Sequence, residues 1–204
     1  MYVNRIEAAH ELAKKIHPES DAVILAIPRG GIVIGDILAE KLGCILDVVI
    51  SKKITPPNYP EYAIGAITHD GTLYKSEYWS KFCNEPGFEH ELVKKQSEVK
   101  RRLEEYRGHD FYELENKPVI LVDDGVATGS TVFAILNWIK KQSPKKITLA
   151  IPVISPNTYE KMKNQVDEMV VLKIPDNFSA VGQFYDDFSQ ISDSQVNKIL
   201  NKYH

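Results

Sequence analysis

Residues Val119–Thr131 read VILVDDGVATGST, and the interpretation of the whole chain depends on this stretch. Four apolar residues come first, then Asp123 and Asp124, then a turn of small residues from Ala127 to Thr131. A short, fully apolar run is typical of a strand buried on both faces, as in a parallel sheet. Polar residues directly after such a strand lie at its carboxyl end, which is where open α/β sheets bind their ligands.

Apolar runs of the same kind alternate with helical patterns along the rest of the chain. Further strands are predicted at 22–27, 47–51, 63–68, 147–153 and 169–172, and helices at 4–17, 32–42, 88–106, 130–142 and 156–164. Strands that alternate with helices indicate βαβ crossovers. We therefore predict an α/β fold with a mostly parallel central sheet flanked by helices.

The bulk properties agree with one ordinary globular domain over residues 1–204, with 43% hydrophobic and 26% charged residues. No apolar run approaches the roughly 18 residues that cross a bilayer, and the first 20 residues lack a secretory pattern, so we expect a cytoplasmic protein without a membrane partner. A net charge of −3 does not favour nucleic acid. Cys44 and Cys83 have no metal-type spacing and are predicted to be idle thiols.

Three groups of polar residues follow predicted strands. Pro28-Arg29-Gly30-Gly31 follows the first, Lys52-Lys53 the second, and Asp123-Asp124 the run described above. Because the carboxyl ends of parallel strands share one edge of a sheet, we expect these groups to contribute to one site.

The turn from Ala127 to Thr131 has the composition of a phosphate cradle. Gly129 permits close approach, and Thr128, Ser130 and Thr131 add hydroxyl donors beside the free N–H groups of a helix start. No lysine precedes the hydroxyl pair, so this is not a nucleoside-triphosphate P-loop.

The adjacent carboxylates suit a different part of a ligand. Asp123 and Asp124 would repel a phosphate, but two neighbouring carboxylates can accept hydrogen bonds from a vicinal diol. Acids for a diol beside a cradle for a phosphate describe a ribose 5-phosphate. The alternative is that Asp-Asp-Gly is only a turn.

With these residues in view, VILVDDGVATGST resembles the phosphoribosyl pyrophosphate (PRPP) motif of type I phosphoribosyltransferases. The resemblance extends over nearly the whole chain to a subgroup of that family without an assigned acceptor. It includes AIPRGGIVIGDILAEKLG, PEYAIGAI, RRLEEYRG and FSAVGQFYDDFSQISDSQV.

The resemblance implies roles for the groups after the strands. Asp123 and Asp124 would hold the ribose hydroxyls, residues 127–131 the 5-phosphate, and Arg29, Gly30 and Gly31 the pyrophosphate, in a loop that often contains a non-proline cis peptide. Mg²⁺ would bridge the pyrophosphate and the ribose hydroxyls, so that the two acids address the metal only indirectly, through those hydroxyls or water.

The reaction so implied displaces pyrophosphate from the anomeric carbon, and basic residues would stabilise the leaving group. Arg29, Lys52 and Lys53 are the candidates for catalysis, and Arg101 and Arg102 are further candidates for binding pyrophosphate. Each has a plain alternative: an exposed turn for Arg29, a solvated strand end for the lysines and a solvated helix face for the arginine pair. The subgroup usually has Arg-Lys-Gly where this chain has Lys52-Lys53-Ile54.

The acceptor is implied to be nitrogenous, most plausibly a nucleobase. Relatives that act on 6-oxopurines commonly have an Asp at the position of Ala127, so an adenine-like base is slightly favoured. The family places a small hood over the core; here about 173–190 and a terminal helix would form it over a core of about 20–172. Phe178, Phe184 and Tyr185 would then line the acceptor pocket, or else seal the sheet edge.

Two other functions stay open. The chain could be a PRPP-binding regulator without efficient transfer activity, although it carries no helix-turn-helix pattern. It could also use the fold as a PRPP synthetase or hydrolase, which the missing triphosphate loop disfavours. By resemblance, we also expect a homodimer and a place in nucleotide metabolism.

Overall fold

The computed structural model describes residues 1–203. The chain forms two compact units. One contains Met1–Val49, Leu114–Thr128 and the described part of the chain from Ser143 onward, and the other contains Ile50–Glu113 and Gly129–Gln142. We refer to them as unit 1 and unit 2.

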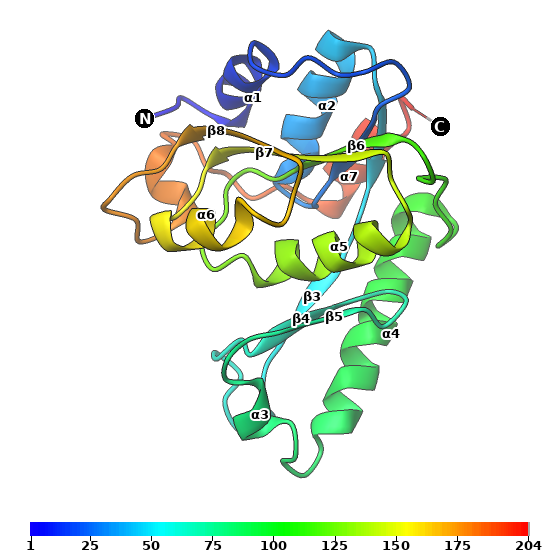
Figure 1. Ribbon diagram of the computed structural model, residues 1–204, viewed down its shortest axis with the longest axis vertical. Helices are drawn as coiled ribbons and strands as arrows, with labels where there is room; N and C mark the ends of the chain where they lie inside the picture. Colours follow the sequence, from blue (N-terminus) through cyan, green and yellow to red (C-terminus); the bar gives the residue numbers. More distant parts are fainter. Residues whose placement is uncertain (204) are drawn as a thin grey trace. The chain divides into compact units, whose positions relative to one another are not determined.

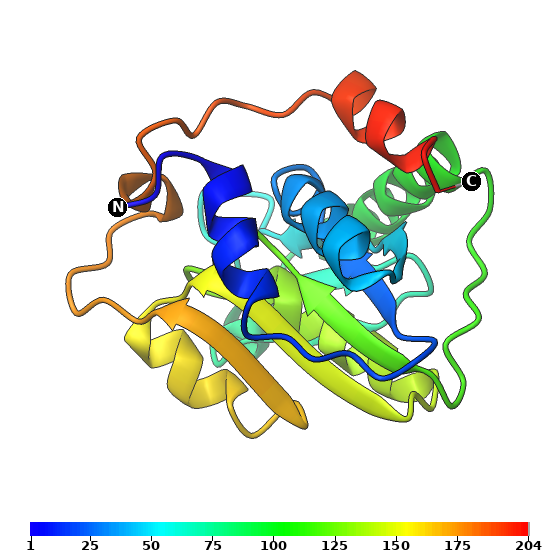
Figure 2. The ribbon, with the colours of Figure 1, turned by 90° about the horizontal axis from the view of Figure 1, so that it is seen from above.

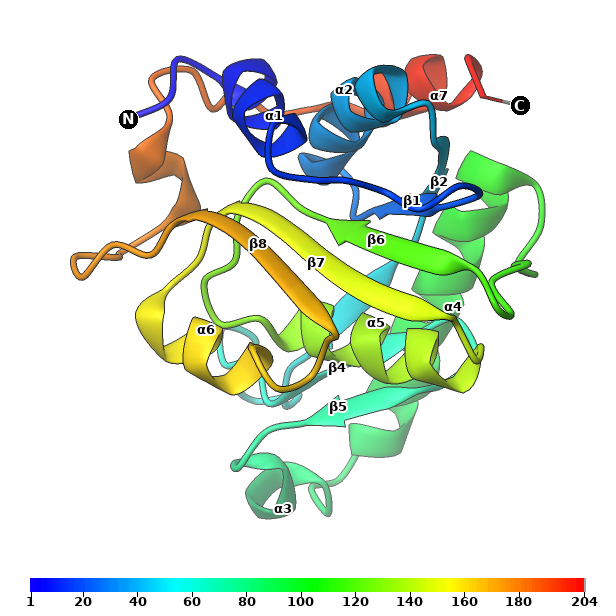
Figure 3. The ribbon, with the colours of Figure 1, turned by 45° about the horizontal axis from the view of Figure 1, so that its top comes forward.

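Unit 1 contains a five-stranded parallel sheet with the order β2-β1-β6-β7-β8. Its strands are β1 (Val23–Ala26), β2 (Ile45–Val48), β6 (Pro118–Val122), β7 (Lys146–Val153) and β8 (Glu168–Lys173). All residues of β1 and β6 are buried, as expected for central strands that are covered on both faces. Figure 3 shows the strands side by side with their carboxyl ends at one edge.

The helices of unit 1 lie on both faces of this sheet. They are α1 (Arg5–Ala13), α2 (Gly31–Leu42), α6 (Pro156–Met162), the 3₁₀ helix η1 (Val181–Phe184) and α7 (Asp193–Leu200). Figure 1 shows α1 and α2 on one face and α6 on the other. The sheet prediction is therefore confirmed for this unit.

The tail of the chain packs on the first residues and on α2. Tyr2 N donates to Phe184 O and Asp186 N donates to Tyr2 O, both at 2.8 Å. Further on, Lys202 Nζ lies 2.7 Å from Asp36 Oδ2, and Tyr203 Oη donates to Asp36 Oδ1 at 2.8 Å. Figure 2 shows this segment running from η1 past α1 to α7.

Unit 2 is built on a three-stranded antiparallel sheet with the order β3-β4-β5. Its elements are β3 (Ser51–Ile54), β4 (Gly65–Thr68), β5 (Leu73–Lys75), α3 (Trp79–Phe82), α4 (Phe88–Arg107) and α5 (Ser130–Lys141). Ile54 belongs to an apolar cluster with Phe88 of α4, whereas Tyr74 stacks on Phe133 of α5 at 4.7 Å. The two helices therefore cover opposite faces of this sheet.

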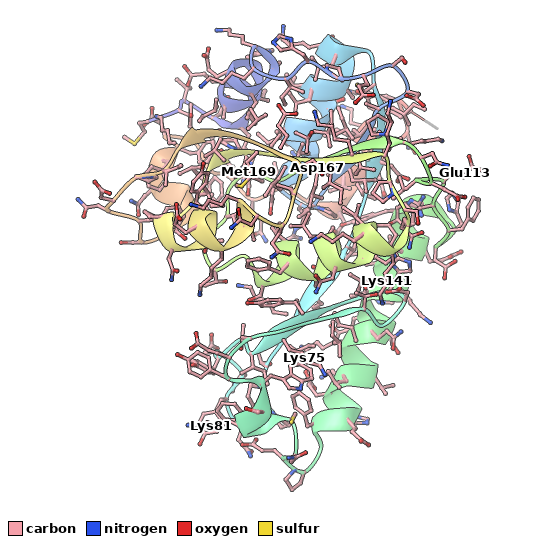
Figure 4. All side chains as sticks on the ribbon, in the orientation of Figure 1. Lys75, Lys81, Glu113, Lys141, Asp167 and Met169 are labelled. Carbon is pink, nitrogen blue, oxygen red and sulfur yellow. The ribbon has the colours of Figure 1, made fainter. Side chains whose placement is uncertain are left out.

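Side chains fix the turn and the strand end of this small sheet. Lys141, at the end of α5, donates to Thr72 Oγ1 at 2.8 Å, and Lys75 Nζ lies 5.1 Å from the centre of the Trp79 ring. Figure 4 labels both lysines, together with Asp167, whose carboxylate accepts from Ile147 N at 2.7 Å in unit 1.

Most predicted elements are present, with one clear error. The predicted strand 47–51 is wrong, because β2 ends at Val48 and β3 begins at Ser51 in the other sheet. Val49 and Ile50 are apolar and connect the two units, so the hydrophobic run conceals the break. The predicted helix 4–17 is shorter than expected and ends at Ala13, and α3 and β5 were not predicted.

None of the helices over residues 1–203 combines the length and the apolar character that crossing a bilayer requires.

Candidate functional site

Asp123 and Asp124 directly follow β6, as predicted, and form a closely linked pair. Asp124 N donates to Asp123 Oδ1 at 2.8 Å. Asp124 Oδ2 accepts from Arg5 Nε at 2.7 Å, with the two side chains 13% and 9% exposed. The first acid is thus held by backbone, and the second by a buried guanidinium.

The two carboxyl groups lie in different electrostatic environments. Burial raises the pKa of Asp123 well above its usual range, and the negative charge of Asp124 raises that pKa further. Asp124, by contrast, has the Arg5 guanidinium 2.7 Å from its Oδ2. The pair therefore contains one carboxylate with a cationic partner and one whose burial opposes ionisation.

The loop after β1 approaches this pair closely. The peptide bond between Pro28 and Arg29 is cis. A Cβ atom built on Gly30 would overlap the Asp124 carboxylate, so only glycine fits at this position. Arg29, also in this loop, lies 3.9 Å from Asp193 at the start of α7 and is one-third exposed. The structure thus brings Gly30 and Gly31 against the acid pair within unit 1, whereas the contact of the preceding Arg29 is with Asp193.

The segment after the acid pair is fixed to the connection between β7 and α6. Val126 N donates to Val153 O at 2.9 Å, and Ser155 N donates to Val126 O at 3.0 Å. The carbonyl of Ala127 accepts from the hydroxyls of Ser155 and Thr158. These bonds direct that carbonyl oxygen toward α6. The oxygen is an acceptor and could not donate to a phosphate, so the predicted cradle does not depend on it.

The remaining cradle residues form the beginning of α5. Thr128 is the last residue of unit 1, and Gly129, Ser130 and Thr131 belong to unit 2. Gly129 has φ 74°, a left-handed conformation that glycine adopts without strain. It caps the helix without a side chain, so the first N–H groups of a 12-residue helix have no capping acceptor from this residue.

The two lysines do not follow a strand, and that prediction is wrong. Lys52 and Lys53 lie within β3, and successive residues of a strand point to opposite faces. Lys52 pairs with Glu98 of α4, and burial, followed by the charges of Lys95 and Arg102, lowers its pKa. Lys53 shares its face with Ser51, whose hydroxyl donates to Thr131 O at 3.0 Å. Lys53 therefore lies on the side of α5.

The arginine pair lies on α4, also in unit 2. Arg101 is 66% exposed and pairs with Glu105 one turn away. Arg102 is partly buried and contributes to the positive field at Lys52. The sequence left a solvated helix face open for both arginines, and the surroundings of Arg101 match that alternative.

The aromatic residues of the tail divide into two groups. Tyr185 is 5% exposed, and its hydroxyl donates to the backbone oxygen of Asp124 at 2.6 Å. Its ring stacks on Phe188 at 5.1 Å. Phe178 and Phe184 are only partly buried and contact each other at 5.3 Å. The first group supports the acid pair, and the second keeps aromatic surface accessible.

Arg5 is the residue of this site that the sequence reasoning missed. It is 8% exposed and lies on the buried side of α1 with Ala8, Ala9 and Leu12. A charged residue at the first position of an otherwise apolar helix stripe was the available signal, because a buried guanidinium needs a partner.

The acid pair also suits a hard divalent cation, which prefers oxygen ligands. Within residues 1–203, no cluster of three or more His, Cys, Asp or Glu side chains forms a site of its own. Two carboxylates fit an ion such as Mg²⁺ that takes its other oxygens from a bound phosphate ligand and from water.

Comparison with known proteins agrees with the geometry. A family model described as a phosphoribosyl transferase domain matches residues 3–189. The Mycobacterium tuberculosis H37Rv protein Rv0571c, provisionally named a phosphoribosyl transferase, is 32% identical over 209 aligned positions. The alignment covers 100% of this chain and 47% of the relative, so the chain spans about half the length of the curated relatives it matches.

Two solved structures share the fold. The TT1426 protein of Thermus thermophilus superposes with a TM-score of 0.83 and 34% identity, covering 99% of this chain and 98% of that one. The AQ2163 protein of Aquifex aeolicus gives a TM-score of 0.53 at 15% identity, covering 96% and 81%, which is a likeness of fold alone.

Proposed function

Because the chain belongs to the phosphoribosyl transferase domain family, we propose that it is a magnesium-dependent phosphoribosyltransferase that joins PRPP to a nitrogenous acceptor. The observation that carries this proposal is the acid pair at the end of β6, with the glycine loop of β1 against it and a glycine-capped helix following it. We also propose that both units act as one functional domain, which the single family match over 3–189 supports.

The acid pair would hold the ribose of PRPP. Arg5 occupies Asp124 Oδ2, so the other oxygen of this carboxylate, Oδ1, would accept from a ribose hydroxyl. Asp123 would accept the neighbouring hydroxyl through the oxygen that the backbone does not engage. Hydrogen bonds to ionised groups are about twice as strong as neutral ones, which supports recognition of a diol here.

Residues 127–131 would hold the 5-phosphate. The start of α5 presents backbone N–H groups, and the helix dipole favours an anion at this end. Thr128, Ser130 and Thr131 would add hydroxyl donors. Lys53 lies on the α5 side of β3 and would supply a compensating charge, whereas the ion pair with Glu98 leaves Lys52 a smaller part than the sequence suggested.

The loop after β1 would hold the pyrophosphate. Arg29 offers a planar fork that matches phosphate oxygens, and Gly30 and Gly31 bring backbone donors close to the ligand. Asp193 is the present neighbour of Arg29 and is half exposed, so an anionic ligand could displace this contact. Arg101 and Arg102 remain proposed contacts of the pyrophosphate, supported by the resemblance of RRLEEYRG.

In the reaction, the bond from the anomeric carbon to the pyrophosphate oxygen breaks while the acceptor nitrogen bonds to that carbon. Negative charge accumulates on the departing pyrophosphate, and Arg29 would stabilise it. Asp123 and Asp124 would help to hold Mg²⁺ indirectly, through ribose hydroxyls or water, and the ion would supply further neutralisation of this charge. The chain's own contribution is to hold the ribose in a fixed orientation.

The acceptor would be a nucleobase bound under the tail, with Phe178 and Phe184 stacking on it. Tyr185 would act indirectly by supporting the acid pair. Ala127 contributes no carboxylate, which slightly favours an adenine-like base over a 6-oxopurine. A cytoplasmic location, a homodimer and a role in nucleotide metabolism complete the proposal.

The experiment is a panel of purine and pyrimidine bases incubated with PRPP and MgCl₂, with released pyrophosphate as the readout. Release with an adenine-like base is the expected result. PRPP binding without release on any base would favour the alternative, a PRPP-binding regulator.

A further inference from the structure

Arg5 is a charged side chain enclosed by the fold. Its side chain is 9% exposed, and it begins the buried stripe of α1. Removing a guanidinium from water is unfavourable unless its donors are satisfied, so its contacts indicate what it does. These contacts lead to one carboxylate and to the tail of the chain.

The contact with the carboxylate is short and directional. Nε donates to Asp124 Oδ2 at 2.7 Å. Nε lies in the plane of the guanidinium, so this bond fixes the rotation of the carboxylate as well as its position. The backbone oxygen of Asp124 is held separately by the hydroxyl of Tyr185 at 2.6 Å.

The tail holds the other side of the guanidinium. The Nη1 atom of Arg5 donates to Ser189 O at 2.9 Å, and Cζ lies 3.9 Å from the centre of the Phe188 ring. The tail is itself paired with the first residues of the chain, where Asp187 N donates to Val3 O at 2.8 Å. Phe188 and Ser189 therefore hold the guanidinium through a ring face and a hydrogen bond, and backbone pairing attaches this part of the tail to the first residues of the chain.

Stability alone does not account for this arrangement. Replacing a buried ion pair by apolar residues of similar volume is often neutral or stabilising. The arrangement is instead suited to holding the Asp124 carboxylate in one orientation, with Oδ2 bound to Arg5. A fixed orientation matters most if a ligand binds to the other carboxylate oxygen, Oδ1.

Resting on the proposed function, we propose that Arg5 is a positioning residue that orients Asp124 toward a ribose hydroxyl, and that residues 184–189 set its position. The sugar site and the proposed acceptor-binding tail are then mechanically connected through one side chain. Displacing the tail would weaken sugar binding without touching the phosphate cradle.

The test uses ribose 5-phosphate and inorganic phosphate as separate probes in calorimetric titrations of the full chain. Arg5→Gln should weaken ribose 5-phosphate binding about tenfold or more, which corresponds to losing one hydrogen bond to a charged group. Its affinity for inorganic phosphate should stay unchanged. Lys14→Gln, at the exposed end of the same helix, is the matched control and should alter neither affinity.

A second variant keeps the test valid if Arg5→Gln does not fold. Phe188→Leu retains apolar packing but removes the ring face, and should weaken ribose 5-phosphate binding about two- to fivefold with no effect on phosphate. Thermal unfolding of each variant separates the two roles, since a purely structural residue would lower Tm and leave the affinity of folded protein unchanged.

A failure of the positioning role gives a different result from a failure of the proposed function. If Asp124→Asn weakens ribose 5-phosphate binding while the Arg5 and Phe188 variants match the wild type, the positioning role is overturned and the proposed function stands. If the wild type binds neither probe, the proposed function itself is overturned.

Discussion

A methyl group at position 30 tests how closely the β1 loop and the acid pair are fitted. Gly30 has φ −64° and ψ −39°, which alanine adopts freely, and a glycine-to-alanine change in such a conformation stabilises a protein by roughly 0.4–1 kcal/mol. The added Cβ would lie 1.8 Å from Asp124 Oδ2 and 3.0 Å from Arg5 Nε. The backbone and the side-chain contact therefore predict opposite signs.

The unfavourable overlap should outweigh the backbone gain. Ordinary van der Waals contact begins at 3.4 Å, so Asp124 Oδ2 has to move by more than an ångström and loses its bond to Arg5. Leaving a charged group without its hydrogen bond costs roughly 1.5–3 kcal/mol, which exceeds the backbone gain. We expect Gly30→Ala to lower the free energy of unfolding by about 1–2 kcal/mol and to weaken ribose 5-phosphate binding.

Urea unfolding of a double-mutant cycle provides the assay. In an Asp124→Ala background the overlap is absent, so Gly30→Ala should there be neutral or stabilising by a few tenths of a kcal/mol or more. Equal destabilisation in both backgrounds would show that the loss comes from something other than the overlap with Asp124.

Three further predictions concern positions in both units. Burial opposes ionisation of Asp70, but hydrogen bonds from the flanking threonines outweigh it and lower its pKa, so Asp70→Asn should reduce Tm at pH 7. The contribution of this group to stability is complete above the unfolded pKa and is lost as the pH falls through the lower folded pKa, so the Tm difference should shrink as the pH falls below about 4; a constant difference would contradict the assignment. Tyr203→Phe removes the hydroxyl on Asp36 and should speed amide hydrogen exchange in α7 while sparing β6, and unchanged exchange in α7 would count against this contact. Lys53→Ala should weaken inorganic phosphate binding several-fold and Lys52→Ala much less, in calorimetric titrations; the reverse order would mean that the two faces of β3 have been misassigned.

The sequence was sufficient where local pattern decides the structure. The short apolar run before Asp123 is typical of a strand buried on both faces, and the end of that strand indicated where the acid pair lies. The small residues after this strand likewise indicated, from local pattern alone, where the next helix begins. Both predictions depend on residues adjacent in the chain, which is where periodicity is informative.

The sequence was insufficient where contacts are long-range. A continuous apolar run hid the break between β2 and β3, so the lysines were placed after a strand rather than within one. Arg5 is 119 residues from the carboxylate that it binds, and no local pattern connects the two. Tyr185 likewise read as a candidate pocket residue, whereas its hydroxyl supports the acid pair.

The proposed function depends above all on Asp123 and Asp124 holding the ribose of PRPP. Calorimetric titration of PRPP, with MgCl₂, into the wild type, the Asp123→Asn/Asp124→Asn double variant and an exposed control, Asp176→Asn, measures this directly. We predict that the double variant binds about a hundredfold more weakly, on the scale of lost charge-assisted hydrogen bonds, and that the control matches the wild type. Undiminished PRPP affinity in the folded double variant would contradict the claim.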